Sequence, residues 1–429
     1  MMRIVLVNES FASPLFYRRW VLYANHYKDW EVFLLAPEVS YVYNSKDNTF
    51  GKTVTNLGEE VHQDNFHIKL FKLKYRRIGG GWESPDFLRL LCEIKPDVIY
   101  NIGTHTQRSL FQLIRIRKKY FPKTKLLSFS MRGPEQNASS FLCKDYPFFQ
   151  RQKRRLYYLL AKYRISVFNK NCDAVLCHYP EALQCFRDEG YKGPIYICTQ
   201  VGVNTERYYE DCDSRKEIRD KYQIGSSFLF GSATRFTTDK GLDDILDALP
   251  LEGNWKFLMM GSGRQDEVDR IKNHIRRRNL EGKVILPGLI SRYEMPKYFN
   301  ALDCLVHVPR TTPKWVETFS IAVVQAMATG KPIIGDSSGS VPYEIGPEGV
   351  IIAEGDIAEL HSKMQWFLDN QNEALKIGTR MRERAVSCFG IYHLNDIFHD
   401  ILHDVMNDQF DPQKVDMSIY KVSKASRNE

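Results

Sequence analysis

Residues 317–335 read ETFSIAVVQAMATGKPIIG and hold the polar groups best placed for chemistry. Glu317 stands just before a short apolar helix that we expect to end at Gly330, and Gln325 follows about two helical turns later. The carboxylate and the amide can then share one face near the helix start. Unpaired N–H groups and the positive dipole end at such a start favour phosphate, and the side-chain oxygens favour sugar hydroxyls. Taken alone, the segment could also be a buried helix with two incidental polar residues.

Two cations occupy the turn after another strand-like run. Arg235 follows FLFGSAT (228–234), and Lys240 comes five residues later, where it opens the helical segment GLDDILDAL. An arginine and a lysine across a strand-to-helix turn suit a diphosphate, because cations and helix N–H groups together balance its charge. The alternative is a solvated basic turn, since short motifs of this kind often arise by chance.

Backbone groups could contribute at two further strand ends. Gly261 ends the run KFLMMG, and Gly263 follows it. Both would let a ligand approach the main chain closely, although a tight turn needs the same residues. Ser320 and its neighbours are placed to present N–H groups at the start of the helix that follows Glu317. Any one of these features can be accidental, but their order and spacing together favour a common site.

Short apolar runs alternate with helical stretches along the chain. The runs that we expect to be strands are residues 3–8, 31–37, 67–73, 97–103, 125–131, 173–178, 195–199, 228–234, 256–261, 283–288, 304–309, 331–335 and 349–354. This alternation predicts an α/β protein whose parallel sheets carry helices on both faces. Ligands in such folds bind at the carboxyl ends of the strands.

The alternation breaks once, in the polar stretch 203–226, which we interpret as a junction between two Rossmann-like domains. A chain of 429 residues also exceeds the usual size of a single core. We therefore predict an acceptor-binding domain over residues 1–203, a donor-binding domain over 204–388 and a C-terminal helix and tail over 389–429. Two facing domains of this kind would form a cleft.

Composition narrows the class of protein. Hydrophobic content of 43% and charged content of 26% are those of a globular protein. No apolar run approaches the length of a membrane span, and the start MMRIVLVNES does not resemble a signal peptide. The nine cysteines form no CxxC pair, so Cys172 and Cys177, with His178, are expected to be small buried residues rather than metal ligands. The expected location is the cytoplasm.

The chain resembles the retaining nucleotide-sugar glycosyltransferases of family four, the glycosyl transferases group 1. The resemblance covers nearly the whole chain and is strongest over residues 228–356. It is carried by the Arg235 to Lys240-Gly pattern, the GSG loop, Glu317 with KPIIG, GVNTERY (202–208), GSVPYEIG (339–346) and FGIYHLNDIFHDILHDVM (389–406). It implies the glycosyltransferase B fold, with two facing Rossmann-like domains and a C-terminal helical tail that crosses back to the first domain.

The resemblance also implies roles for the matching residues. Arg235 and Lys240 would hold the donor diphosphate and stabilise charge on the leaving nucleotide, with no metal or other cofactor required. Glu317 would accept hydrogen bonds from hydroxyls of the transferred sugar, and these three are the predicted catalytic residues. Further donor contacts are implied for Gly261, Gly263, Thr318, Phe319, Ser320, Ile321 and Gln325.

Several positions depart from the family pattern. Gln325 stands where a second glutamate is usual, and losing that charge-assisted bond to the ribose would cost about 1 kcal/mol of donor affinity. NESFASPLFYRRW after the first strand contains no glycine-rich loop. Arg132 replaces a family histidine and could contact the donor phosphate or an acidic acceptor. His105 lies at another strand end, where it is either an acceptor-site residue or a structural histidine.

The net charge of +8 comes from the first half of the chain, since residues 201–429 are net acidic. The stretches 115–125 and 151–171 place lysine and arginine beside tyrosine, leucine and phenylalanine. This combination is typical of helices that lie on an anionic membrane surface, with a solvated basic face as the alternative. Nucleic acid is not an expected partner, because no recognised binding motif occurs.

These features predict a retaining, metal-independent enzyme that moves a hexose-type sugar from a nucleotide-sugar donor to a glycan or lipid-linked acceptor. Surface polysaccharide or glycoconjugate synthesis, peripheral on the inner face of the membrane, is the expected setting. Two alternatives stay open: a catalytically weak partner of another transferase, and a nucleotide-sugar epimerase of the same architecture. A dehydrogenase is not expected, because no strand leads into GxGxxG with an acidic residue about 20 positions on.

Overall fold

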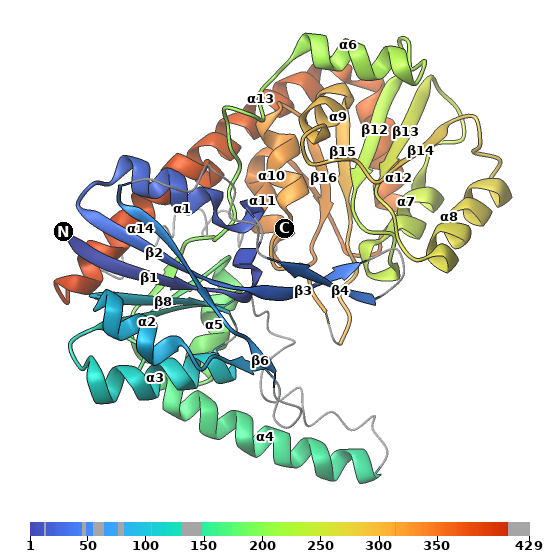
Figure 1. Cartoon of the computed structure of the whole chain (residues 1–429). Helices are drawn as coiled ribbons and strands as arrows, with labels where there is room; N and C mark the ends of the chain where they lie inside the picture. Colours follow the sequence, from blue (N-terminus) through green and yellow to red (C-terminus); the bar gives the residue numbers. More distant parts are fainter. Residues whose placement is uncertain are drawn as a thin grey trace. The chain divides into compact units, whose positions relative to one another are not determined.

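The computed structural model describes residues 1–12, 14–44, 49–54, 64–75, 81–103, 105–130, 148–313 and 315–410. They form two compact units, which can be followed by colour in Figure 1. The first unit takes most described residues up to Val201 and, in addition, the end of the last helix from Asn395 on. The second unit consists mainly of Gly202–Leu394.

Seven parallel strands form the sheet of the first unit, in the order β11-β10-β9-β8-β1-β2-β5. They are β1 (Met2–Val7), β2 (Trp30–Pro37), β5 (Phe66–Phe71), β8 (Val98–Ile102), β9 (Lys125–Ser130), β10 (Ala174–Cys177) and β11 (Ile195–Ile197). Most of their residues are buried without alternation, as expected for strands with helices on both faces. The pairs β3 (Val39–Asn44) with β4 (Thr49–Val54), and β6 (Lys74–Tyr75) with β7 (Trp82–Glu83), were not expected from the sequence.

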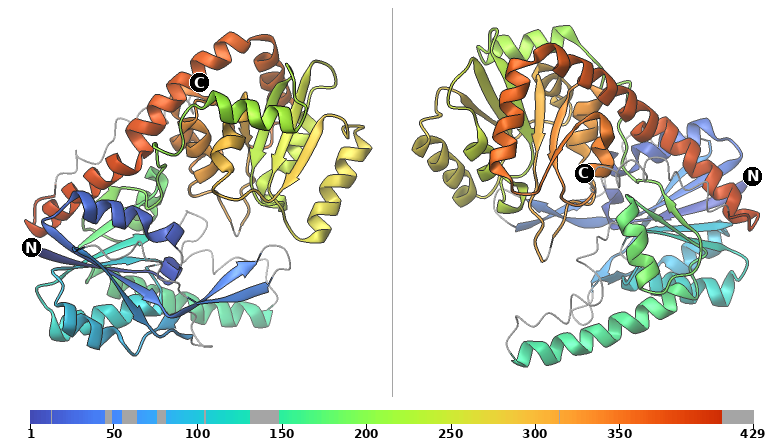
Figure 2. Two further views of the ribbon diagram at one scale, coloured as in Figure 1. Left: turned by 45° about the horizontal axis from the view of Figure 1, so that its top comes forward. Right: turned by 180° about the vertical axis from the view of Figure 1, so that it is seen from behind.

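The helices of the first unit connect these strands. They are α1 (Pro14–His26), α2 (Phe87–Ile94), α3 (Arg108–Tyr120), α4 (Phe148–Asn169) and α5 (Pro180–Asp188), with the short 3-10 helix η1 (Glu9–Ala12) after β1. The last helix, α14 (Ile391–Met406), joins them from the other end of the chain. It is drawn in red, and it ends beside the N-terminus in each view of Figure 2.

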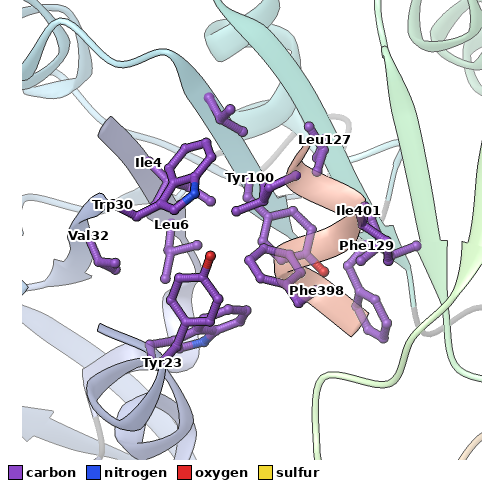
Figure 3. Packing of buried hydrophobic residues seen from close by; sticks show 14 of the residues in the cluster. Ile4, Leu6, Tyr23, Trp30, Val32, Tyr100, Leu127, Phe129, Phe398 and Ile401 are labelled. Atoms are coloured by element: carbon purple, nitrogen blue, oxygen red, sulfur yellow. The ribbon is translucent and has the colours of Figure 1, made fainter. Parts of the chain in front are cut away.

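The core of the first unit explains why the C-terminal helix returns to it. Phe398 and Ile401 of α14 are buried in one cluster with Tyr100 of β8 (Figure 3). Trp20 of α1 belongs to the same cluster. The Phe398 ring lies 5.0 Å from that of Trp20 and 5.2 Å from that of Tyr100. Burying such rings stabilises the packing by a few kcal/mol each. The predicted C-terminal helix that crosses back to the first domain is confirmed.

Six parallel strands form the sheet of the second unit, in the order β14-β13-β12-β15-β16-β17. They are β12 (Phe228–Ala233), β13 (Trp255–Met260), β14 (Val284–Gly288), β15 (Cys304–His307), β16 (Ile333–Asp336) and β17 (Val350–Ile352). The direction of the strand order reverses between β12 and β15, the first and fourth strands of this unit. This is the arrangement of a Rossmann-like sheet.

The helices of the second unit alternate with its strands, apart from the leading α6 and the closing pair α12 and α13. They are α6 (Cys212–Lys221), α7 (Leu242–Ala248), α8 (Gln265–Arg277), α9 (Met295–Ala301), α10 (Ile321–Ala328), α11 (Val341–Ile345), α12 (Ile357–Asp369) and α13 (Gln371–Phe389). Every strand expected in either half is present within two residues of its expected bounds, which confirms the α/β class and the two Rossmann-like sheets. No described helix combines the length and apolar composition that crossing a bilayer requires.

Candidate functional site

The reversal point of the second sheet brings together two residues that the sequence analysis singled out. Lys240 ends a 3-10 turn, η5 (Thr238–Lys240), in the connection that follows β12. Glu317 lies in the connection between β15 and α10, 77 residues further along the chain. Ligands of open α/β sheets bind at the carboxyl ends of the strands beside such a reversal. The pair therefore occupies the position in this unit where a ligand site is expected.

Lys240 and Glu317 form a buried ion pair. Lys240 Nζ donates to Glu317 Oε2 at 2.8 Å, and His307 Nε2 lies 3.4 Å from the same oxygen. The ammonium also lies 3.9 Å from the ring centre of Trp315, a cation–π distance. Burial raises the pKa of Glu317, but the nearby His307 and Lys240 lower it by more than burial raises it. The resulting pKa is about 2, below the usual value of a glutamate. Glu317 is therefore a carboxylate that can only accept hydrogen bonds.

Glycine fixes the turn that carries Lys240. Gly241 has a φ of 65°, and a Cβ atom there would lie 1.8 Å from the carbonyl oxygen of Val308. The turn can therefore approach the end of β15 only because residue 241 has no side chain. Arg235, in the same connection, is exposed and pairs with no carboxylate in the described part of the chain. Its five N–H donors are free for a ligand of opposite charge.

The GSG loop packs against the turn of Arg235. Phe236 N donates to Ser262 O at 2.9 Å. A Cβ on Gly261 would lie 1.8 Å from Thr234 O, and one on Gly263 would lie 2.5 Å from Phe236 O. The close contact between these two backbone turns therefore explains why positions 261 and 263 are glycine. This agrees with the interpretation of the GSG segment as a tight turn. Donor contacts at these two positions stay a prediction.

A fully buried carboxyl group, that of Glu344 in α11, holds the segment after Glu317. Ser320 N donates to both carboxyl oxygens, at 2.9 and 3.0 Å, and Ser340 Oγ donates to one of them at 2.6 Å. Ser340 N also donates to Glu317 O at 2.9 Å. The N–H of Ser320 is thus engaged within the protein, and the main-chain groups at Thr318 and Ile321 are the better candidates for phosphate.

Gln325 lies inside α10, but the helix does not extend back to Glu317. It begins at Ile321, with Ser320 as its N-cap in an extended conformation. The expectation that Glu317 and Gln325 share a helical face two turns apart is therefore wrong, because residues 317–320 are not helical. Gln325 is half-buried, and its side chain lies close to the Tyr208 hydroxyl, whose pKa burial raises.

His105 and Arg132 are the two candidate site residues in the first half of the chain. His105 is buried, its Nε2 lies 2.7 Å from Glu189 Oε2, and its ring packs on Phe168 and Phe186, which favours a structural histidine. Arg132 lies outside the described residues.

The cysteine and histidine residues considered as metal ligands are enclosed in the first unit. Burial raises the pKa of the thiols of Cys172 and Cys177 and lowers the pKa of His178 to about 3. Imidazole Nδ1 of His178 pairs with Thr199 Oγ1 at 2.6 Å. Small buried thiols were the expectation for the two cysteines.

Three further residues near this pair are not predicted from the sequence. His307 ends a strand that had been recognised, and Trp315 follows it in a connection of irregular structure. Glu344 carried a usable signal, because it is the one acidic residue in the apolar segment VPYEI, which separates two expected strands. A carboxylate in such surroundings is rarely buried unless it is hydrogen-bonded.

Asp336, the last residue of β16, is a buried acidic residue whose titration should affect the stability of the protein. It is fully buried, Ser338 N donates to its Oδ1 at 3.0 Å, and burial raises its pKa to about 8. Between about pH 4 and pH 8 the folded chain therefore keeps a proton that the unfolded chain has lost. The free energy of unfolding of the native protein should fall across this window.

Asp336→Asn removes this titration. Its stability relative to the native protein should rise by about 1.4 kcal/mol per pH unit between pH 5 and pH 8 and level off above that. Chemical denaturation of both proteins at each pH measures the difference. A difference that does not change with pH would show that Asp336 is ionised in the folded protein throughout.

Comparison with known proteins agrees with this fold. Residues 214–384, within the second unit, match the family of glycosyl transferases group 1. Two solved structures are similar over nearly the whole chain. Sucrose-phosphate synthase from Thermosynechococcus elongatus has a TM-score of 0.68 at 17% identity, covering 95% of this chain and 100% of that one. HepE of Anabaena in complex with UDP has a TM-score of 0.69 at 16% identity, covering 94% and 100%.

The curated relatives match less of the chain than these structures do. A GDP-mannose-dependent α-(1-6)-phosphatidylinositol monomannoside mannosyltransferase of Mycobacterium tuberculosis is 25% identical over 191 residues, 42% of this chain and 49% of that protein. The chain spans a fifth to about half the length of the first curated relatives that it matches. The two Rossmann-like sheets and the C-terminal helix that joins the first unit give the chain the glycosyltransferase B fold. The similarity to the glycosyl transferases group 1 is shown over residues 214–384.

Proposed function

We propose that this protein transfers a hexose-type sugar from a nucleotide-sugar donor to a glycan or lipid-linked acceptor, with retention at the anomeric carbon. The observation that carries the proposal is the buried Lys240–Glu317 pair at the reversal point of the second sheet. It places a cation for the diphosphate next to an acceptor for sugar hydroxyls. The family of the chain and the mannosyl transfer named for its relative support the same reaction class.

The roles of the two residues follow from their donors and acceptors. Lys240 has three N–H donors, so two remain for the donor diphosphate while one stays on Glu317. In the reaction the bond from the anomeric carbon to the diphosphate breaks and a bond to the acceptor oxygen forms. The acceptor proton passes to the leaving phosphate. Lys240 and Arg235 would stabilise the charge that develops on that phosphate, without a metal ion.

A thermal-shift panel of UDP-, GDP- and ADP-sugars tests the first part of this proposal. Only a donor that binds the folded chain should raise its melting temperature. The stabilising donor is then incubated with acceptor extracts, with and without EDTA, and release of the nucleoside diphosphate is measured. Stabilisation without turnover would favour the alternative of a catalytically weak binding partner. Gln325, an amide at the position where the resemblance implies a ribose-binding carboxylate, is the observation that favours this alternative.

We also propose that α4 docks on an anionic membrane surface. Its exposed residues from position 158 on are Leu159, Lys162, Tyr163, Ser166 and Lys170. They recur every three or four positions and therefore form one face of the helix labelled in Figure 1. Leu159 is 57% exposed and Tyr163 is 66% exposed, while two lysines share their face. Apolar side chains flanked by cations are suited to the boundary between lipid headgroups and acyl chains.

Replacing both Leu159 and Tyr163 with serine should reduce the fraction that pellets with phosphatidylserine vesicles by about tenfold, because two apolar insertions are lost. Leu375→Ser is the matched control, since Leu375 is 69% exposed on α13 in the second unit. Added salt should also release the native protein. Equal pelleting of the double variant and the control would contradict docking through α4.

A further inference from the structure

Three metal-ligating side chains meet on the surface of the first unit, where α14 packs against the turn before β2. Asp29 lies in that turn, and His399 and His403 lie one helical turn apart on α14. The two Nε2 atoms are 3.1 Å apart. Asp29 Oδ2 lies 3.8 Å from Nε2 of His399 and 3.7 Å from Nε2 of His403. The donor set is thus two imidazole nitrogens and one carboxylate oxygen.

These distances match the spacing of ligands around a single ion. Zn²⁺ binds nitrogen and oxygen at about 2.0–2.2 Å in tetrahedral sites, which places neighbouring ligand atoms about 3.3–3.5 Å apart. The three measured separations, 3.1, 3.7 and 3.8 Å, lie on either side of that value. An ion could therefore contact all three atoms after shifts of a few tenths of an ångström.

The surroundings orient His399 as a ligand through Nε2. Its Nδ1 lies 3.1 Å from the hydroxyl of Tyr23, whose oxygen can accept the ring proton and so leave a lone pair on Nε2. The ring stacks on Tyr27 at 3.8 Å, and the Tyr27 hydroxyl bonds the carboxylate of Asp396 on the same helix. Metal-binding histidines usually have such a partner on the second nitrogen, because it fixes the tautomer and the ring orientation.

The site is open to solvent on its other side. The side chain of His403 is 44% exposed and that of Asp29 is 46% exposed, whereas His399 is 17% exposed. Water can complete the coordination there, and an ion can enter without a change of fold. Asp396 and Asp400, both exposed and close to His399, make the local potential more favourable for a cation.

We propose that Asp29, His399 and His403 bind one divalent transition-metal ion, with Zn²⁺ as the best match for a two-imidazole, one-carboxylate set. The ion would connect α14 to the turn before β2 and so hold in place the helix that supplies Phe398 and Ile401 to the core. The site lies in the first unit, whereas Lys240 and Glu317 belong to the second. It is a structural site, separate from the sugar-transfer chemistry proposed above.

The test uses the full chain without a histidine tag, stripped with EDTA and titrated with zinc chloride by calorimetry. Native protein should bind one ion at this site and melt at a higher temperature with zinc, but not with magnesium. His403→Ala should lose this binding, and Asp29→Asn should weaken it by at least about tenfold. His393→Ala is the matched control, because His393 is exposed on the same helix and outside the cluster.

Asp29→Asn changes an exposed turn residue and should leave folding intact, which circular dichroism verifies. It keeps the test decisive even if a histidine variant is unstable. Cobalt(II) gives a second readout, since visible absorption bands on binding report nitrogen and oxygen coordination in the native protein and their loss in the variants. Zinc binding of equal affinity and stoichiometry in the native protein and Asp29→Asn, or none in the native protein, would overturn the proposal. If the native protein binds no zinc, the short distance between the two Nε2 atoms reflects a hydrogen bond in which the imidazoles share one proton.

Discussion

Lys240→Ala should reduce the release of nucleoside diphosphate from the donor by at least about 100-fold. Removing one preorganised donor to a developing negative charge typically costs a factor of 10²–10³ in rate. Here the variant also leaves the carboxylate of Glu317 buried without its ammonium partner, at 2.8 Å in the native protein. The measurement is initial-rate release of the diphosphate, with the donor that stabilises the native chain and an acceptor extract.

A double variant in which both residues of the ion pair are neutral separates the catalytic role of Lys240 from its contribution to the free energy of unfolding. Removing one partner of a buried pair costs about 3–5 kcal/mol, because the remaining charge is uncompensated. Lys240→Met combined with Glu317→Gln leaves no charge behind, so much of the lost stability should return. Activity should stay absent, since neither the phosphate cation nor the carboxylate for sugar hydroxyls is restored.

An exposed ion pair is the control for this series. Lys376 Nζ pairs with Glu373 Oε1 at 2.6 Å on α13, and both side chains are about half exposed or more. Lys376→Ala should leave activity unchanged and stability within the small range of surface pairs. If Lys240→Ala and Glu317→Ala both kept full turnover, the assignment of the reaction to this pair would be wrong. If the double variant regained activity along with stability, the pair would be structural only.

The sequence predicted the sheets well because strands buried on both faces are continuous apolar runs, such as those around Val32 and Phe230. It also singled out Lys240 and Glu317 as candidates, because charged residues in the connections between strands and helices stand out from their apolar surroundings. The contact between them could not be read from the sequence, since it depends on the strand order that places β15 next to β12. The same holds for His307, which in the sequence looks like the end of an ordinary strand.

Other features depend on backbone geometry that a residue pattern does not specify. The helix after Glu317 begins at Ile321, three residues later than expected, because Ser320 is held in an extended conformation by Glu344. The cluster of Asp29, His399 and His403 joins positions some 370 residues apart, which only the return of α14 brings together. Spacing along the chain shows the helical pair of histidines, but not the aspartate that completes it.

Glu344→Ala should destabilise the protein by about 3–5 kcal/mol, whereas Glu344→Gln should cost about 1 kcal/mol or less. Alanine leaves the N–H of Ser320 and the hydroxyl of Ser340 unsatisfied in a fully buried position and adds a cavity. Glutamine has nearly the same volume and still accepts from both groups. Burial raises the pKa of Glu344 well above its usual range and so favours the neutral carboxyl group, which an amide resembles closely.

Urea denaturation of the native protein and both variants measures the stability difference, and amide exchange at Ser320 reports whether the segment after Glu317 loosens. Faster exchange at Ser320 in the alanine variant, with exchange close to native in the glutamine variant, is the expected pattern. Donor affinity should fall in the same order, because residues 317–320 carry Glu317 and the main-chain groups that we propose for the donor. Equal losses in both variants would mean that Glu344 is ionised and that its charge holds the segment. No loss in either would mean that Arg384, which donates to the carbonyls of Tyr343 and Glu344, is sufficient to keep α11 in place.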